Sequence, residues 1–306
     1  MSYRSVFRSD LFSGKAFIVT GGGSGIGRCT AHELSSLGAE VFLIGRTAQK
    51  LNAVVGEIAE TGGRAVAMPC DIREPDKVIA TVSSVLERAG RIDGLVNNAG
   101  GQFVVPLAEM SLNALNALWR NNFVGAFLFS RACFDAWMRD NGGAVVNVLA
   151  DYGRGMPGLA HSGASRAALG NFTMSASVEW ARYGIRVNSV SPGYVASSGL
   201  DSYPDHMRSF FEHVHEAVPL QRQAHVAEIS GAICFLLSDA AAFITGANIQ
   251  IDGGASLVRP LTPWAHMENR RDGAPSDFPR PLPRHHQSKP FDGFPLESAP
   301  DFFKRS

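Results

Sequence analysis

Ser162 and Arg166 stand four residues apart in LAHSGASRAALGNF (residues 159–172), a run of small residues that predicts the start of a close-packed helix. Residues at this spacing share one face of a helix, so the hydroxyl and the guanidinium would point into the same cleft. Both side chains donate hydrogen bonds, and an arginine cannot act as a general base. The pair is suited to holding polar atoms of a ligand, and the elements around it decide which ligand that is.

A glycine-rich segment, TGGGSGIGR, follows directly on an apolar strand and runs into a predicted helix. Gly21, Gly25 and Gly27 let the backbone turn tightly and approach a pyrophosphate, whose charge would meet the helix N-terminus. The strand before the turn and the helix after it are the context that this mechanism requires. We therefore expect a dinucleotide site, which includes Ser24 and Ile26 between these glycines.

The second predicted strand ends in EVFLIGRT, which places Arg46 about 20 residues beyond the glycine-rich turn. NAD-selective sites carry an acidic residue at this point, where it binds the ribose hydroxyls, whereas an arginine suits a 2′-phosphate. The sequence therefore predicts NADP(H) in preference to NAD(H). The alternative interpretation is that Arg46 is a solvated surface charge.

Two further predicted strands end in short polar motifs. Asp71 and Ile72 end the third strand, where they would meet the adenine, and Asn98, Ala99 and Gly100 end the fourth. Because the carboxyl ends of parallel strands meet at one edge of a sheet, we assign all five residues to the cofactor site.

Composition favours a small-molecule partner. The 306 residues carry 28 basic and 28 acidic side chains, so charge gives no case for binding nucleic acid or an anionic membrane surface. The chain has neither a long uncharged apolar stretch nor the apolar core of a signal peptide at its start. Its four cysteines have no metal-ligand or CxxC spacing, which predicts buried, reduced thiols: Cys29, Cys70, Cys133 and Cys234. We expect a cytoplasmic protein whose partner is a small molecule or another copy of itself.

Short segments rich in β-branched residues alternate with longer amphipathic ones, which predicts alternating strands and helices. The strands are expected at 16–20, 40–44, 65–69, 94–98, 144–148, 186–190 and 247–251. The helices are expected at 28–38, 49–62, 75–90, 111–140, from 162 onward, and at 225–238. This alternation predicts an α/β fold: a single doubly wound domain, with helices on both faces of a parallel sheet, over residues 12–258.

Residues 259–306 hold nine of the sixteen prolines and show little apolar periodicity. Such a segment cannot propagate a helix or the interior of a sheet. Two interpretations stay open: a loose tail, or an arm that lies over a neighbouring subunit through its aromatic side chains.

The motifs TGGGSGIG, CDI, NNAG, NNFVG and SPGYVASS, in this order and spacing, resemble the short-chain dehydrogenase/reductase family over residues 12–256. The resemblance implies a Rossmann-like sheet of seven parallel strands, a nicotinamide cofactor and a homodimer or homotetramer. It also implies that Asn122 is the active-site asparagine and that Pro192, Gly193 and Val195 lie beside the nicotinamide.

The chain departs from this family at its catalytic residues. The family carries a serine after the fifth strand and a Tyr-x-x-x-Lys on the next helix, whereas this sequence has Ala150, Ser162 and Arg166 at those positions. The flanking ASRAAL and VEWARYGIRVNSVSPG match the family closely, which argues against a misalignment. Either catalysis is lost or the site is rebuilt.

Tyr152 is the one tyrosine of five that directly follows the fifth strand, at the edge where open α/β sheets bind ligands. A displaced tyrosine with a serine in the ordinary tyrosine position resembles the 2,4-dienoyl-CoA reductases. NNAGGQF, AHSGASRA, VEWA and IDGGASL resemble the peroxisomal-type trans-2-enoyl-CoA reductases, and HSGASRA, GMPG and SSGLDSYP resemble citronellol/citronellal dehydrogenases.

This resemblance implies NADPH-dependent reduction of an enoyl- or dienoyl-CoA thioester, in which negative charge develops on the thioester oxygen. Tyr152 and Asn122 are then the expected donors to that oxygen, Ser162 is a further donor, and Arg166 binds the nicotinamide ribose. The expected partner is an acyl-CoA or a terpenoid. The alternatives are a citronellol/citronellal-type or 3-oxoacyl dehydrogenase and a protein that binds NADP(H) without chemistry.

Overall fold

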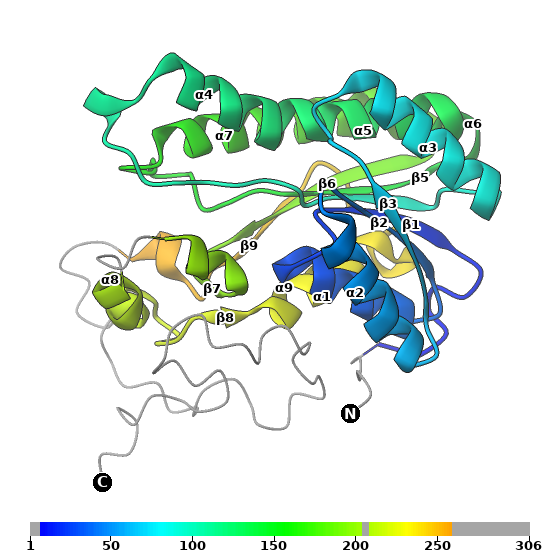
Figure 1. The fold of residues 1–306 in the computed structure, drawn as a ribbon, viewed down its shortest axis with the longest axis horizontal. Coiled ribbons are helices and arrows are strands. Elements are labelled where there is room, and N and C mark those ends of the chain that lie inside the picture. The colour runs from blue at the N-terminus through cyan, green and yellow to red at the C-terminus, as the bar shows by residue number, and fades with distance from the viewer. Residues whose placement is uncertain (1–6, 204–207, 259–306) are drawn as a thin grey trace, which may run out of the picture.

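Seven strands form one sheet in which every strand is parallel to its neighbours, in the order β3-β2-β1-β4-β5-β6-β9 (Figure 1). This computed structural model describes residues 7–203 and 208–258. The strands are β1 (Ala16–Thr20), β2 (Glu40–Gly45), β3 (Arg64–Pro69), β4 (Gly94–Asn97), β5 (Gly143–Val148), β6 (Ile185–Pro192) and β9 (Asn248–Ile251). The predicted parallel sheet and its seven strands are confirmed.

Helices cover both faces of this sheet, as the alternating pattern predicts (Figure 1). One layer contains α1 (Gly25–Ser36), α2 (Ala48–Glu60) and α9 (Val226–Leu237), and the other contains α3 (Pro75–Ala89), α5 (Gly125–Cys133) and α7 (Ala160–Trp180). Side chains of a strand alternate between the two faces, so Val19 packs in the first core and Ile18 in the second. Both are fully buried.

The predicted helical stretch 111–140 is interrupted twice. It consists of α4 (Leu112–Trp119), α5 and α6 (Arg139–Asn141), which are joined by two π-helical segments, Arg120–Val124 and Phe134–Met138. π-Helical turns inside α-helices are rare and often coincide with functional sites. The first of them contains Asn122.

Beyond the carboxyl end of β6 lies a small two-stranded sheet of β7 (Val195–Ala196) and β8 (Ala224–His225). The segment between these strands contains α8 (Arg208–His213), which lies beyond the end of the main sheet (Figure 1). Phe211 of α8 is buried, and its carbonyl oxygen accepts a hydrogen bond of 3.1 Å from Gln223 Nε2. This segment is therefore anchored against the body of the domain.

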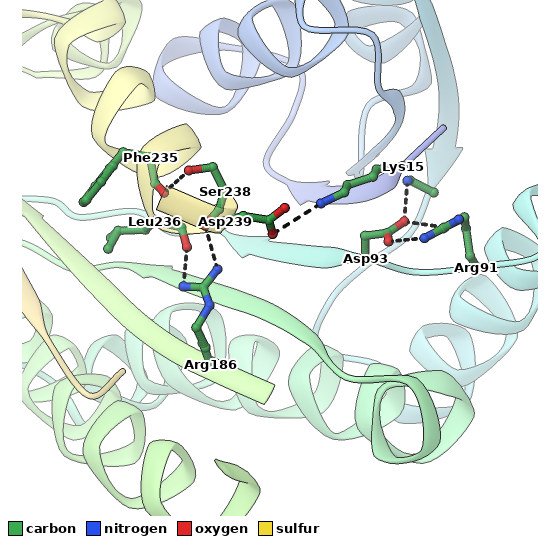
Figure 2. Close-up of polar contacts among 9 residues, drawn as sticks. Lys15, Arg91, Asp93, Arg186, Phe235, Leu236, Ser238 and Asp239 are labelled. Atoms are coloured by element: carbon green, nitrogen blue, oxygen red, sulfur yellow. Dashed lines mark hydrogen bonds and ion pairs between the residues drawn. The ribbon is translucent and has the colours of Figure 1, made fainter. Parts of the chain in front are cut away.

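The amino ends of the strands carry structural polar contacts (Figure 2). Arg186 donates to the carbonyl oxygens of Leu236 and Ser238 at 2.7 and 3.1 Å, which satisfies acceptors at the end of α9. Asp93 pairs with Arg91 and accepts a hydrogen bond from the Ala16 amide. A cavity of about 420 Å³ lies among these residues, at the edge of the sheet opposite the glycine-rich turn. We therefore do not regard it as the candidate site.

All four cysteines are buried and no disulfide joins them, as predicted. Within residues 7–203 and 208–258, no helix combines the length and apolar character needed to cross a bilayer. The predicted tail or arm at 259–306 lies outside the described residues.

Candidate active site

The order of the strands reverses between β1 and β4, and parallel sheets bind ligands in the crevice above such a point. The glycine-rich turn follows β1 and Asn98 follows β4, so both lie at this crevice. The other predicted site residues follow the carboxyl ends of β2, β3, β5 and β6, or lie on α7 and the π-helical turn. The fold thus brings the predicted set to one edge of the sheet.

Asn98, Gly21 and Gly27 pack closely and hold the glycine-rich turn in its conformation. Asn98 Nδ2 donates to the carbonyl oxygens of Thr20 and Gly21 at 3.0 and 3.3 Å. A Cβ added at Gly27 would stand 2.3 Å from the Gly21 oxygen and 2.4 Å from Asn98 Nδ2. Gly27 therefore has no room for a side chain, which accounts for the third glycine of the motif.

Space remains on the outer side of the same turn. Gly25 has a φ of +54°, a conformation that favours glycine, and a Cβ added there would find no atom closer than 3.9 Å. Ser24 precedes α1, and its side chain makes no capping hydrogen bond to the helix. The first amides of α1 thus remain available to an anion, and the turn fits a dinucleotide pyrophosphate.

Arg46 is exposed at the end of β2, and the structure gives it no ion pair with a described carboxylate. Asp71 at the end of β3 pairs instead with Arg73, at 2.8 Å from Nε and 2.6 Å from Nη2. This hydrogen-bonded pair outweighs partial burial and lowers the pKa of Asp71 to about 2, with a further contribution from the charge of Arg46. The Ile72 side chain is buried and packs against Gly125. Its contact with adenine stays a prediction.

Arg166 is buried on α7 and donates a hydrogen bond of 2.6 Å from Nη1 to the Val148 carbonyl oxygen. Burial lowers the pKa of Arg166 to about 10, so the guanidinium stays charged at neutral pH. No described carboxylate forms an ion pair with it. Its Nη2 lies against Gly100, where an added Cβ would stand only 2.1 Å away. A buried cation facing the crevice without a counter-charge is suited to a polar ligand.

Asn122 is buried in the π-helical turn and holds the loop after β4. Its Oδ1 accepts from the Gly101 amide at 2.9 Å, and its Nδ2 donates to the Gly101 carbonyl oxygen at 3.0 Å and to Ser165 Oγ at 3.1 Å. Both amide hydrogens are thus engaged within the protein. This arrangement is suited to positioning the loop at Gly101, and the expected hydrogen bond from Asn122 to substrate stays a prediction.

Ser162, at the family's tyrosine position, is also buried. Its hydroxyl donates to Gln102 Oε1 at 3.4 Å, and Gln102 Nε2 donates to the Tyr203 hydroxyl at 2.5 Å. The sequence reasoning missed Gln102 and Tyr203, which are 101 residues apart. The only signal was that Gln102 directly follows NNAGG at the edge of the sheet.

Tyr152 lies in the loop after β5 and packs against a different part of α7. Its hydroxyl packs against Gly170, where an added Cβ would stand 2.3 Å away, and the ring joins the apolar group around Leu149 and Leu169. Gly170 is eight residues beyond Ser162, which corresponds to about 12 Å along a helix. The structure therefore does not bring Tyr152 and Ser162 together, and the catalytic role of the Tyr152 hydroxyl stays a prediction.

The last predicted group follows β6. Gly193 passes so close to Asp252 that an added Cβ would stand 2.8 Å from the Asp252 Cα, and Val195 belongs to β7 beyond the buried Pro192. Burial raises the pKa of Asp151, at the end of β5, and the charge of Asp252 raises it further. Gly193, which is expected beside the nicotinamide, thus lies against Asp252, a residue that the sequence did not single out.

Comparisons with known proteins agree with this fold. A family model described as enoyl-(acyl carrier protein) reductase matches residues 21–256. The peroxisomal 2,4-dienoyl-CoA reductase of Danio rerio is 35% identical over 84% of this chain and 86% of its own length. A probable 2,4-dienoyl-CoA reductase of Bacillus subtilis is 32% identical over 79% of this chain and 97% of its own. The solved structure of the citronellol catabolism dehydrogenase AtuB of Pseudomonas aeruginosa has 48% identity and a TM-score of 0.76, and the match covers 83% of this chain and all of that one.

The glycine-rich turn, the sheet order and these relatives lead to one conclusion. This chain belongs to the short-chain dehydrogenase/reductase family, and it is an oxidoreductase of the NAD(P)(H)-using type.

Proposed function

We propose that the protein reduces the α,β-double bond of an enoyl- or dienoyl-CoA thioester with NADPH. The observation that carries this proposal is the replacement of the family's tyrosine and lysine by Ser162 and Arg166, together with Ala150 at the position of the family's serine. Reduction of a ketone or aldehyde requires an acid at the substrate oxygen, which a tyrosine beside a lysine provides. Reduction of a conjugated double bond needs hydrogen-bond donors at the thioester oxygen instead.

The bound nicotinamide nucleotide would supply a hydride to Cβ of a 2-enoyl thioester or to Cδ of a 2,4-dienoyl thioester. The chain's own residues then have three tasks: to hold the cofactor, to stabilise negative charge on the thioester oxygen and to admit a proton from water to Cα. Arg166 suits the first task, because its buried guanidinium faces the crevice at Gly100 and can donate to the nicotinamide ribose. Asn122 contributes by fixing Gly101 beside it.

Preference for NADPH rests on Arg46. Its guanidinium is exposed at the end of β2, while the neighbouring Arg73 uses its donors on Asp71. A free guanidinium can bind a 2′-phosphate through two parallel hydrogen bonds. The relatives named 2,4-dienoyl-CoA reductases are consistent with this assignment.

A second candidate, oxidation or reduction of a citronellol/citronellal-type terpenoid, is favoured by the 48% identity to the citronellol catabolism dehydrogenase. A substrate panel separates the two: NADPH oxidation with 2-enoyl- and 2,4-dienoyl-CoA thioesters, with citronellal and with a 3-oxoacyl thioester. We expect turnover of the unsaturated thioesters. Turnover of citronellal alone would favour the second candidate, and NADPH binding without turnover of any compound would contradict both.

We further propose that the protein forms a homodimer or homotetramer. Three helices on one face of the sheet expose large apolar side chains, which are Leu112 and Trp119 on α4, Phe127 on α5, and Met174 and Val178 on α7. Ring contacts connect Trp119 to Phe127 through Phe123 and Phe172, and exposed apolar patches mark protein interfaces. The charge balance and reduced cysteines favour the cytoplasm as compartment, although the Danio rerio relative is named peroxisomal.

A further inference from the structure

A hydrogen-bonded chain of three side chains crosses the candidate active site. It begins at Ser162 on α7, passes through the carboxamide of Gln102 after β4, and ends at the Tyr203 hydroxyl, with separations of 3.4 and 2.5 Å. Tyr203 comes from the segment between β7 and α8, far from the other two in sequence. A phenol thus lies one carboxamide away from the position where the family carries its tyrosine.

The directions of these two hydrogen bonds leave the O–H of Tyr203 without an acceptor among the described residues. Ser162 uses its hydroxyl hydrogen on Gln102 Oε1, and Gln102 uses an amide hydrogen on the oxygen of Tyr203. The Tyr203 oxygen is therefore an acceptor in this chain, and no described residue accepts a hydrogen bond from its own O–H. That hydrogen is available to a ligand.

Packing fixes the phenol in this position. The ring of Tyr203 meets the ring of Phe211 edge to face, with centroids 4.9 Å apart. Phe211 is itself only 6% exposed and is tied to Gln223 through its carbonyl oxygen. Burial raises the pKa of Tyr203, so its hydroxyl is protonated at neutral pH and acts as a donor. A rotamer held by a buried neighbour is suited to catalysis, because the donor needs no reorganisation.

The geometry points to Tyr203 as the hydroxyl that donates a hydrogen bond to the substrate's carbonyl oxygen, with Gln102 and Ser162 as its positioning residues. This inference deepens the proposed function and rests on it. The hydrogen bond requires no transfer of the phenolic proton: Tyr203 stabilises the charge that develops on the oxygen as the hydride reaches the conjugated double-bond system.

The test compares single hydroxyl deletions in the full chain. Tyr203→Phe keeps the ring against Phe211 and removes only the O–H. We expect kcat for a 2,4-dienoyl-CoA to fall by about 10² to 10³, with little change in KM, because the interaction strengthens in the transition state. Ser162→Ala and Gln102→Leu should lower kcat less, since the donor itself remains. Tyr183→Phe, on the short helical turn after α7, removes a hydroxyl far from the crevice and should leave kcat unchanged.

Each possible result of these assays either supports or overturns the proposed role of Tyr203. Wild-type kcat in Tyr203→Phe, or a loss confined to Ser162→Ala, would overturn it while leaving the proposed function intact. If the wild type reduces citronellal and not the thioesters, the proposed substrate class fails, and the same Tyr203→Phe loss with citronellal would still support the inference. A wild type that reduces no compound of the panel would overturn both. Thermal unfolding of each variant identifies any loss of activity that comes from loss of folded protein.

Discussion

The Arg166 guanidinium lies so close to Gly100 that a Cβ added at residue 100 would stand 2.1 Å from Nη2. Nη1 of the same group is held at 2.6 Å by the Val148 carbonyl oxygen, so the guanidinium has little freedom to move aside. Gly100, which follows the NNA motif, thus leaves room for the buried Arg166, which replaces the family's lysine.

Gly100→Ala should therefore displace Arg166 and weaken cofactor binding. Overpacking of this kind typically costs about 1 to 3 kcal/mol, so we expect NADPH affinity to fall by about 5- to 150-fold. Titration of NADPH by fluorescence gives the affinity. Gly101→Ala is the matched control, because its added Cβ would find its nearest atom, Asn121 Nδ2, at an ordinary 3.5 Å. Equal affinities of the Gly100 and Gly101 variants would contradict this account.

The position of Tyr152 can be tested by packing alone. An alanine at Gly170 would place a Cβ 2.3 Å from the Tyr152 hydroxyl but 3.3 Å from the ring carbon that carries it. Gly170→Ala should lower stability by about 1 to 3 kcal/mol, although alanine favours a helix. Tyr152→Phe should rescue most of that loss, because it removes the clashing atom. Denaturant midpoints of the two single variants and the double variant measure this coupling. Simple additivity would show that Tyr152 points elsewhere.

Local patterns in the sequence were sufficient to predict the fold. Runs such as AFIVT and AVVNV are apolar because both faces of a parallel strand are covered, and that requirement is visible residue by residue. The glycine-rich turn could be predicted for the same reason. Gly27 has no room for a side chain, and one of the two nearest atoms that fill this space is the Gly21 carbonyl oxygen, only six residues earlier; the other, Asn98 Nδ2, comes from after β4.

The direction of individual side chains could not be predicted in this way. Tyr152 follows β5 at the correct edge, but its hydroxyl turns toward Gly170, and nothing in the flanking sequence encodes that choice. Gln102 and Tyr203 meet only because the segment after β7 folds back over the end of β4. Contacts between residues so far apart in the sequence depend on tertiary packing, so the local hydrophobic periodicity does not predict them.

Arg46 should determine the choice between the two cofactors. A hydrogen bond to a charged group contributes about 1.5 to 3 kcal/mol, so Arg46→Ala should weaken NADPH binding by roughly 10- to 100-fold. NADH lacks the 2′-phosphate, so its affinity should change little. Parallel titrations of both cofactors measure the difference. Lys50→Ala, another exposed cation on the neighbouring α2, controls for general loss of positive charge. An equal loss for NADPH and NADH in Arg46→Ala would show that Arg46 is only a surface charge.

The exposed apolar side chains of α4, α5 and α7 should hold the oligomer together. Phe127 is 40% exposed and belongs to an aromatic row with Phe172, their ring centroids 5.8 Å apart. Phe127→Glu would place a charge in a desolvated interface, so the protein should shift toward its monomer mass of 32.7 kDa. Size-exclusion chromatography with light scattering measures the mass. Ile79→Glu, at an exposed apolar position on α3, should leave it unchanged. A monomeric wild type would contradict the proposed assembly.

The contact between α1 and α2 predicts how stability depends on pH. Arg28 is fully buried on α1, and its Nη2 lies 2.7 Å from the Glu57 carboxylate on α2, which His32 also contacts at 3.0 Å. Burial raises the pKa of Glu57, but the hydrogen bonds from His32 and Arg28 outweigh it and lower the pKa to about 2. Because the folded-state pKa lies below the unfolded value, the ionised carboxylate stabilises the fold above about pH 4.5. That contribution is lost as the pH falls toward 2.

Glu57→Gln should therefore lower stability near pH 7 by about 1.5 to 3 kcal/mol, because it leaves the buried Arg28 without a counter-charge. The difference from wild type should shrink as the pH falls from about 4.5 toward 2, since wild-type Glu57 is then protonated as well. Denaturant unfolding at fixed protein concentration from pH 7 to pH 3 measures both effects. Asp135→Asn removes an exposed ion pair with Arg131 and should change stability by less than about 1 kcal/mol. A difference between Glu57→Gln and wild type that stays constant with pH would show that the carboxylate's charge does not stabilise the contact between the two helices.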